Sequence, residues 1–211
     1  MSLADKFFQE KFANRTVRRW EGINLSYDEN TFQRDKPLDY LTWICLELKE
    51  ISSDPIVIEL GAARQPMNHN KQDLNPHCCN DGHSTFFWVE EGFKTFSVDV
   101  TPDCPSFLGE RANLENYIFC NKDGVKFLQE YSGKIDLLFL DAWDVTPSLP
   151  YAEKHLEAFI AAESKLSKKH LIAIDDTDVG SGGKGKLLIP VLLEKGYHLV
   201  VDGRVSIFKN Y

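Results

Sequence analysis

The chain has 211 residues and a formal net charge of −8, with 24 Lys and Arg against 32 Asp and Glu. This acidic balance argues against nucleic acid or an anionic membrane as a partner. No apolar run approaches the roughly 20 residues that a membrane-spanning helix needs. Five cysteines, an odd number, and a charged N-terminal segment predict a reduced, cytoplasmic protein. We expect a single domain over residues 1–211.

The first 35 residues are predicted to form a helical extension. Apolar side chains there could make one face of one or two short helices: Phe7, Phe8, Phe12, Val17 and Trp20. If these aromatics are exposed, they allow a homodimer as well as a monomer. The basic side chains of this segment either bind an anionic ligand or line a solvated helix face: Arg15, Arg18 and Arg19.

The next segment predicts a helix followed by a buried strand. Asp35 and Pro37 are typical of a helix start, and apolar residues at helical spacing continue it for about 14 residues. After Pro55 comes the apolar run Ile56–Gly61, whose acidic residue and glycine are typical of the first strand of a nucleotide-type α/β fold.

Residues 62–82 are predicted to be an inserted loop or lid. The segment is polar, and it holds several potential zinc ligands: His69, Asp73, His77, Cys78, Cys79 and, just after it, His83. Adjacent cysteines and the lack of C-x-x-C pairs do not match a closed zinc site, so zinc is the weaker alternative. A lid that excludes water from the substrate is the favoured interpretation.

Two further strands are predicted at 93–98 and 117–120, with a helix start at 81–85 before them. Asp99 ends the first of these strands, where a carboxylate can accept hydrogen bonds from ribose hydroxyls. Asp123 follows the second strand and precedes a helical segment.

The stretch Ile135–Asp178 predicts a β-α-β unit with acidic residues at both strand ends. The runs IDLLFL and HLIAI are continuously apolar, as in parallel strands buried on both faces. Asp141 follows the first, and Asp175 and Asp176 follow the second. Parallel strands about 4.8 Å apart end at one edge, so these acids are expected to face one site. The alternative is that they cap helices or lie in solvent.

The segment after this unit allows two interpretations. Gly180–Lys186 matches G-x-x-x-x-G-K, but Leu187 stands where a phosphate-binding loop needs Ser or Thr. A flexible glycine loop with Lys184 and Lys186 at the site's rim is favoured, either touching an anionic acceptor or simply solvated. The chain then ends in a predicted antiparallel hairpin, 197–201 and 204–208, around Asp202-Gly203.

The ordered segments IVIELGA, FSVDV, FCNKDGVKFL, IDLLFLDAWD and HLIAIDDTD, closed by the hairpin, resemble class I S-adenosylmethionine-dependent methyltransferases over roughly residues 36–211. Among these, the chain is similar to small-molecule O-methyltransferases of the cephalosporin-hydroxylase and catechol O-methyltransferase-like group. The resemblance implies an α/β fold: a Rossmann-like three-layer sandwich whose mostly parallel seven-stranded sheet ends in an antiparallel hairpin.

The resemblance also implies a set of residues that bind S-adenosylmethionine. Gly61 would admit the methionine part, Asp99 would bind the ribose and Asp123 would lie beside the adenine. The chain departs from the family in an insertion of roughly 18 residues and in Ala63, which replaces a second glycine. Glu59 and Asp99 have structural roles as their alternative. The full set is Glu59, Gly61, Gly82, Ser84, Asp99, Asp123 and Asp141.

In metal-dependent members of the family, carboxylates at these strand ends bind Mg²⁺, which activates the acceptor hydroxyl. The matching residues here are Asp141, Asp175 and Asp176. The lysine base of catechol-type enzymes is missing, because this chain has Ala-Trp-Asp144 after Asp141. The predicted catalytic base is Asp144 or His155. A structural role for His155 is equally compatible with its apolar neighbours.

The leading hypothesis is an S-adenosylmethionine-dependent O-methyltransferase that acts, with a divalent metal, on a small hydroxylated acceptor such as a sugar or a natural-product intermediate. One alternative is a non-catalytic Rossmann-like module that has lost cofactor binding. Another is a nucleotide-dependent phosphotransferase that uses Gly180–Lys186.

Overall fold

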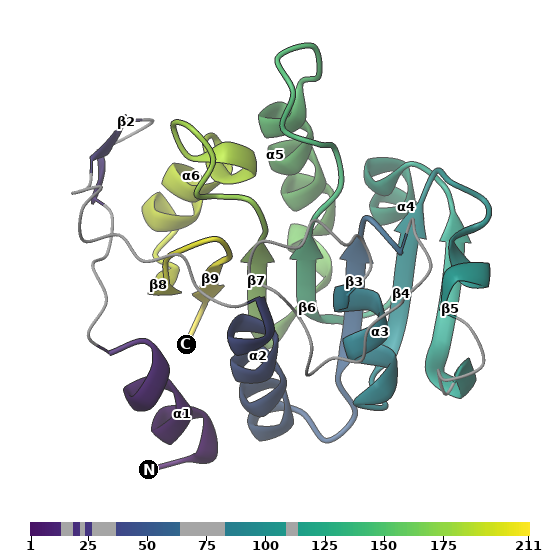
Figure 1. Ribbon diagram of the computed structural model, residues 1–211, viewed down its shortest axis with the longest axis horizontal. Coiled ribbons are helices and arrows are strands. Elements are labelled where there is room, and N and C mark those ends of the chain that lie inside the picture. Colours follow the sequence, from purple (N-terminus) through teal and green to yellow (C-terminus); the bar gives the residue numbers. More distant parts are fainter. Residues whose placement is uncertain (14–18, 22–23, 27–36, 64–82, 109–113) are drawn as a thin grey trace.

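The computed structural model describes residues 1–13, 19–21, 24–26, 37–63, 83–108 and 114–211 (Figure 1). A seven-stranded sheet runs through its centre in the order β5-β4-β3-β6-β7-β9-β8. The first five of these strands are parallel, whereas β9 pairs antiparallel with both β7 and β8. The strands are β3 (Ile56–Leu60), β4 (Lys94–Asp99), β5 (Tyr117–Asn121), β6 (Ile135–Leu140), β7 (Leu166–Ile174), β8 (His198–Val201) and β9 (Ser206–Lys209).

Helices cover both faces of the sheet and make a three-layer sandwich (Figure 1). One apolar core packs α2 (Pro37–Ile51) and α3 (His83–Glu90) on one face. A second core packs α4 (Gly124–Glu130), α5 (Tyr151–Ala162) and α6 (Leu188–Glu194) on the other. All six residues of β6 are buried, as expected for a parallel strand covered on both sides. The predicted fold class is confirmed.

Short 3₁₀ turns complete the connections: η2 (Cys104–Phe107), η4 (Leu114–Asn116), η5 (Glu163–Lys165) and η6 (Gly183–Gly185). No helix within the described ranges is long and apolar enough to cross a membrane.

The N-terminal extension is only partly helical. Helix α1 (Leu3–Lys11) packs its aromatic side chains on α2, with the Phe12 and Tyr40 rings 5.5 Å apart. The next described residues form a short antiparallel pair, β1 (Arg19–Glu21) and β2 (Asn24–Ser26), where a helix is predicted. Arg15, Val17 and Arg18 lie outside the described residues, as do residues 64–82 of the predicted lid.

The C-terminal hairpin differs from the predicted two-residue turn. Four residues, 202–205, join β8 to β9, and the second strand begins at Ser206 rather than Arg204. The reason is that Thr177, after β7, donates from its backbone N–H to the Arg204 carbonyl (2.9 Å) and from its hydroxyl to the Gly203 carbonyl (2.7 Å). These hydrogen bonds hold Arg204 in a loop beside the end of β7.

Candidate functional site

The ends of the five parallel strands form one edge of the sheet. The hydrogen-bond ladder continues one residue past the strands: Gly61 N–H donates to the Val98 carbonyl (2.9 Å), and Asp141 N–H donates to that of Leu60 (2.9 Å). Asp175 N–H likewise donates to the Leu140 carbonyl (3.0 Å). The backbone therefore aligns the residues that follow β3, β6 and β7 along the edge where α/β sheets bind ligands.

A cavity of about 220 Å³ opens at this edge. Its walls come from the loops after β3, β4, β5 and β6. Five residues singled out from the sequence line it: Gly61, Asp99, Asp123, Asp141 and Asp144. Lys122, Trp143 and Leu149 contribute to the same lining.

The backbone conformation and close packing at position 61 require a glycine. Its φ is +92°, in the region that favours glycine, and a Cβ built on it would lie 2.7 Å from the Asp141 carbonyl oxygen. The glycine therefore allows the ends of β3 and β6 to approach each other, and it leaves the cavity wall open.

Asp99 and Asp123 line the cavity and also hold its loops. Asp99 accepts from the backbone N–H groups of Ala62 (3.0 Å) and Thr101 (2.8 Å), and so ties together the loops after β3 and β4. Asp123 caps α4 by accepting from the Lys126 N–H (3.0 Å). A carboxylate offers about four acceptor sites, so Asp99 keeps capacity for a further donor.

Glu59 is not among the residues that line this cavity. It is fully buried, and its Oε2 accepts from the hydroxyls of Thr85 (2.6 Å) and Ser97 (2.5 Å). Burial raises the pKa of Glu59, against hydrogen bonds from Ser84, Ser97 and Thr85 that lower it. Glu59 and Ser84 thus connect β3, β4 and α3, and their predicted contact with a cofactor stays a prediction. Gly82 lies outside the described residues.

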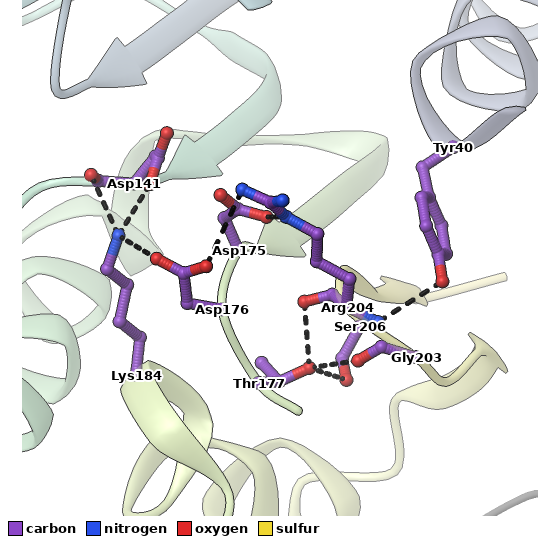
Figure 2. A network of polar contacts seen from close by, with 9 residues as sticks. All are labelled: Tyr40, Asp141, Asp175, Asp176, Thr177, Lys184, Gly203, Arg204 and Ser206. Atoms are coloured by element: carbon purple, nitrogen blue, oxygen red, sulfur yellow. Dashed lines mark hydrogen bonds and ion pairs between the residues drawn. The ribbon is translucent and has the colours of Figure 1, made fainter. Parts of the chain in front are cut away.

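The three acids that follow β6 and β7 do come together, as the sequence predicts. Asp141, Asp175 and Asp176 each offer one carboxylate oxygen, and these oxygens lie within 4.8 Å of one another. We call these three residues the carboxylate cluster (Figure 2). Asp176 has a φ of +49° and Trp143, two residues after Asp141, a φ of +50°. Such backbone strain in non-glycine residues concentrates at functional sites.

Two cations complete the cluster. The Lys184 ammonium lies 2.5 Å from Asp141 Oδ1 and 3.1 Å from Asp176 Oδ2 (Figure 2). Arg204 places its Nε 3.3 Å from Asp175 Oδ1 and its Nη2 3.7 Å from Asp176 Oδ1. The Lys184 side chain is only 1% exposed, although the sequence predicts a lysine on a flexible glycine loop.

Close backbone packing carries Lys184 into the cluster. Gly183 has a φ of +48°, and a Cβ there would lie 1.7 Å from the Asp176 carbonyl oxygen. The N–H of Gly183 donates to the Val179 carbonyl (2.7 Å), and that of Gly185 donates to the Gly182 carbonyl (3.0 Å). These N–H groups and Lys184 already have partners, so they are not available to cradle a phosphate as the phosphotransferase alternative needs.

Hydrogen bonds to α2 and to the segment after β7 hold the backbone of Arg204. Its N–H donates to the Tyr40 hydroxyl of α2 (3.1 Å, Figure 2). Its carbonyl accepts from Thr177 N–H. Gly203 allows this approach, since a Cβ there would lie 2.2 Å from the same hydroxyl oxygen.

The charges of the cluster shift one another's pKa values. Burial and then the neighbouring Asp141 raise the pKa of Asp175 to about 6, against the opposing effect of Arg204. Burial likewise raises the pKa of Asp141, which Lys184 opposes. For Lys184, burial lowers the pKa, but the three carboxylates raise it more, so the net shift is upward. The lysine is therefore an ammonium ion.

No family model matches the sequence, and no curated protein matches it. Solved structures do match. A putative caffeoyl-CoA O-methyltransferase from Staphylococcus aureus has 13% identity and a TM-score of 0.53, over 86% of this chain and 87% of that one. The O-methyltransferase from Bacillus cereus in complex with SAH has the same identity and TM-score, over 86% and 85%.

A longer protein also matches, the MycE methyltransferase from the mycinamycin biosynthetic pathway in complex with Mg and SAH. Its identity is 15% and its TM-score 0.51, over 76% of this chain but only 46% of MycE. The chain thus spans less than half the length of MycE. The chain has the class I methyltransferase fold. At these identities the likeness establishes the fold alone.

In this methyltransferase fold, the cavity suits a nucleoside-containing cofactor. Asp99 and Asp123 present carboxylates at the ends of β4 and β5, and Gly61 keeps side-chain atoms out of the space between β3 and β6. The residues present therefore fit S-adenosylmethionine.

The carboxylate cluster does not suit a metal ion as it stands. Mg²⁺ takes six oxygen ligands at about 2.0–2.1 Å. Here the oxygens of Asp141 and Asp176 already surround the Lys184 ammonium, which also donates to the Asp141 carbonyl (3.1 Å). A metal ion would have to displace this lysine.

Of the two predicted bases, one lies at the cavity. Asp144 is exposed there. His155 is buried in α5, with Nδ1 2.6 Å from the Tyr151 carbonyl and its ring packed edge-on against Trp143. Burial, and then the charge of Lys184, lower the pKa of His155 to about 3, so the ring is neutral. His155 is not among the residues that line the cavity, which favours its structural role.

Proposed function

We propose that the chain is an S-adenosylmethionine-dependent O-methyltransferase that acts on a small hydroxylated acceptor. The observation that carries the proposal is the cavity at the strand ends, where Gly61, Asp99 and Asp123 converge directly beside the carboxylate cluster. The solved O-methyltransferases that share the fold support the reaction type.

The residues of the cavity have separate roles in this proposal. Asp99 accepts hydrogen bonds from the ribose hydroxyls while its backbone partners hold it in place. Asp123 and Trp143 border the adenine, and Gly61 leaves room for the methionine part. When bound, S-adenosylmethionine supplies an electrophilic methyl group on a sulfonium.

The acceptor side involves Asp144 and a second cavity. Asp144 is exposed at the cofactor cavity, where its carboxylate can take the proton of an acceptor hydroxyl. A neighbouring cavity of about 450 Å³ shares Leu149 with the first and is lined by Tyr151, Glu153 and Lys186 among others. We place the acceptor there, since polar side chains in a space of this size suit a small hydroxylated molecule.

The competing candidate is a non-catalytic module with the same fold. Two observations favour it: Glu59 does not line the cavity, and His155 is buried and neutral. Cofactor binding separates the two candidates, because the module would bind neither S-adenosylmethionine nor its demethylated product.

Isothermal titration calorimetry with both ligands tests the proposal. We expect wild-type protein to bind them, and Asp99→Asn to bind about tenfold to a hundredfold more weakly, since a hydrogen bond to a charged group contributes about 1.5–3 kcal/mol. Asp103→Asn is the matched control: Asp103 is exposed in the next turn and makes no side-chain cap. Folded wild-type protein that binds neither ligand would overturn the proposal.

A further inference from the structure

The cation position of the carboxylate cluster is filled by a residue of the chain itself. We propose that Lys184 is the resident cation of this cluster and takes the place of a divalent metal ion, so that methyl transfer by this protein needs no metal. The part about methyl transfer rests on the proposed function. The part about the cation rests on the cluster alone, and its test measures metal binding and not methyl transfer.

Three oxygens of the cluster lie around the Lys184 ammonium. An ammonium group has three N–H donors. Lys184 Nζ donates to Asp141 Oδ1 at 2.5 Å and to the Asp141 carbonyl at 3.1 Å, and it forms an ion pair with Asp176 Oδ2 at 3.1 Å. Three oxygens of the cluster thus surround the ammonium. The group sits among hard oxygen ligands of the kind that Mg²⁺ selects, which is why the acids alone resemble a metal site.

The charge of the cluster is also largely compensated without a metal. Three carboxylates face two cations, Lys184 and Arg204, which leaves a net charge of −1. A divalent ion that enters must expel the Lys184 ammonium. That side chain is 1% exposed, so the expelled charge would be left without partners inside the protein unless the loop moved.

The loop that carries Lys184 is fixed against the same strand end. Gly183 packs its Cα so near to the Asp176 carbonyl that no side chain fits between them. Gly182 also has a positive φ, of +107°, and η6 begins directly after it. The backbone conformation that delivers Lys184 therefore depends on two adjacent glycines, and the lysine is a built component of the cluster.

Lys184 acts as a positioning residue in this account. It joins the end of β6 to the segment after β7 and orients Asp141, which lines the cofactor cavity. Because its side chain is 1% exposed and its ammonium is enclosed by oxygens of Asp141 and Asp176, it does not activate the acceptor hydroxyl as a metal ion would. Removal of the hydroxyl proton then depends on a side chain exposed at the cavity, and Asp144 is placed for it.

Electron paramagnetic resonance of Mn²⁺ tests the inference directly, since bound and free Mn²⁺ give different signals. We expect no saturable Mn²⁺ binding by wild-type protein. We expect Lys184→Met to gain one saturable site, because Met is uncharged and one atom shorter, so it vacates the position of the ammonium and keeps most of the apolar side chain. The double variant Lys184→Met/Asp176→Asn loses that site again. Lys186→Met, which removes a lysine two positions away, gains none.

The outcomes separate the two proposals. Saturable Mn²⁺ binding by wild-type protein that Asp176→Asn abolishes would overturn the inference. So would a folded Lys184→Met protein that binds no Mn²⁺. If Lys184→Met does not fold, the wild-type titration decides alone. Failure to bind S-adenosylmethionine in a separate calorimetric titration would overturn the proposed function and leave the result on the cation intact.

Discussion

Aspartates at the strand ends have different surroundings in the two halves of the sheet edge, an open half after β3–β5 and a closed half after β6 and β7. On the β3–β5 side, Asp99 and Asp123 are held by backbone N–H groups and line an open cavity. On the β6–β7 side, the carboxylate cluster is closed by Lys184 and Arg204 (Figure 2). An aspartate at a strand end therefore does not by itself indicate a ligand site. The counter-charge decides, and here it comes from loops much later in the chain.

The largest loss of stability is expected when the buried cation of the closed half, Lys184, is removed. Lys184→Met leaves one buried and two partly exposed carboxylates with Arg204 alone, and loss of one partner from a buried ion pair costs about 3–5 kcal/mol. We expect this loss in the free energy of unfolding, measured by urea denaturation. Lys186→Met should stay within about 0.5 kcal/mol of wild type. Equal effects of the two substitutions would contradict a structural role for Lys184.

Two glycines of the loop that carries Lys184 allow a matched test of whether close backbone packing positions this lysine. Gly180 and Gly183 both have positive φ, +54° and +48°, but only Gly183 would bring a Cβ against another atom. We expect Gly180→Ala to cost about 1–2 kcal/mol from backbone strain alone. Gly183→Ala should cost about 2–4 kcal/mol, since it adds a clash with the Asp176 carbonyl. Thermal denaturation of both variants checks the order.

His155, which packs against Trp143 of the cavity wall, should make the free energy of unfolding depend on pH. The pKa of His155 is about 3 in the folded chain, below the ordinary 6.5. Below pH 6.5 the unfolded chain binds a proton that the folded chain does not, so the contribution of His155 is complete above pH 6.5 and is lost as pH falls toward 3. We expect about 2 kcal/mol of this loss by pH 5, since one pKa unit is about 1.4 kcal/mol.

His155→Phe keeps the ring against Trp143 and removes the titrating group. Its free energy of unfolding should therefore fall less between pH 7 and pH 5 than that of wild type, by denaturant titration at each pH. An unchanged slope would show that His155 is not the group responsible.

The smallest effect is expected where the closed half meets α2. Tyr40→Phe removes the hydroxyl that accepts from the Arg204 N–H. Loss of one such hydrogen bond costs about 1 kcal/mol. Urea denaturation should show this modest loss, while the calorimetric affinity for S-adenosylmethionine stays as in wild type because Tyr40 does not line the cofactor cavity.

Local sequence was enough to predict the sheet and its acidic edge. The strand ends at Asp99, Asp141 and Asp175 follow short apolar runs whose order matches the parallel topology. The partners of these acids were not predictable in this way. Lys184 lies 43 positions after Asp141, on a glycine loop that looks solvated, and Arg204 lies 29 positions after Asp175, where a strand was expected.

The hydrogen-bond partners of Glu59 also could not be predicted from the sequence, because they depend on how β3 pairs with β4. In the sheet Glu59 lies directly opposite Ser97 of β4, whose hydroxyl donates to it. A strand buried on both faces has no polar alternation to reveal which face its one acid occupies. A run of hydroxyl residues in the neighbouring elements, Ser84, Thr85 and Ser97, is the signal that could have indicated a buried carboxylate.

The contrast between the open and the closed half is tested most directly by titrating the demethylated product, S-adenosylhomocysteine, into three proteins by calorimetry with EDTA present. We predict that wild-type protein binds it, that Asp99→Asn loses about tenfold or more in affinity, and that Asp176→Asn keeps its affinity within about threefold, under 0.7 kcal/mol. Absence of binding by folded wild-type protein, or equal losses in the two variants, would contradict the account.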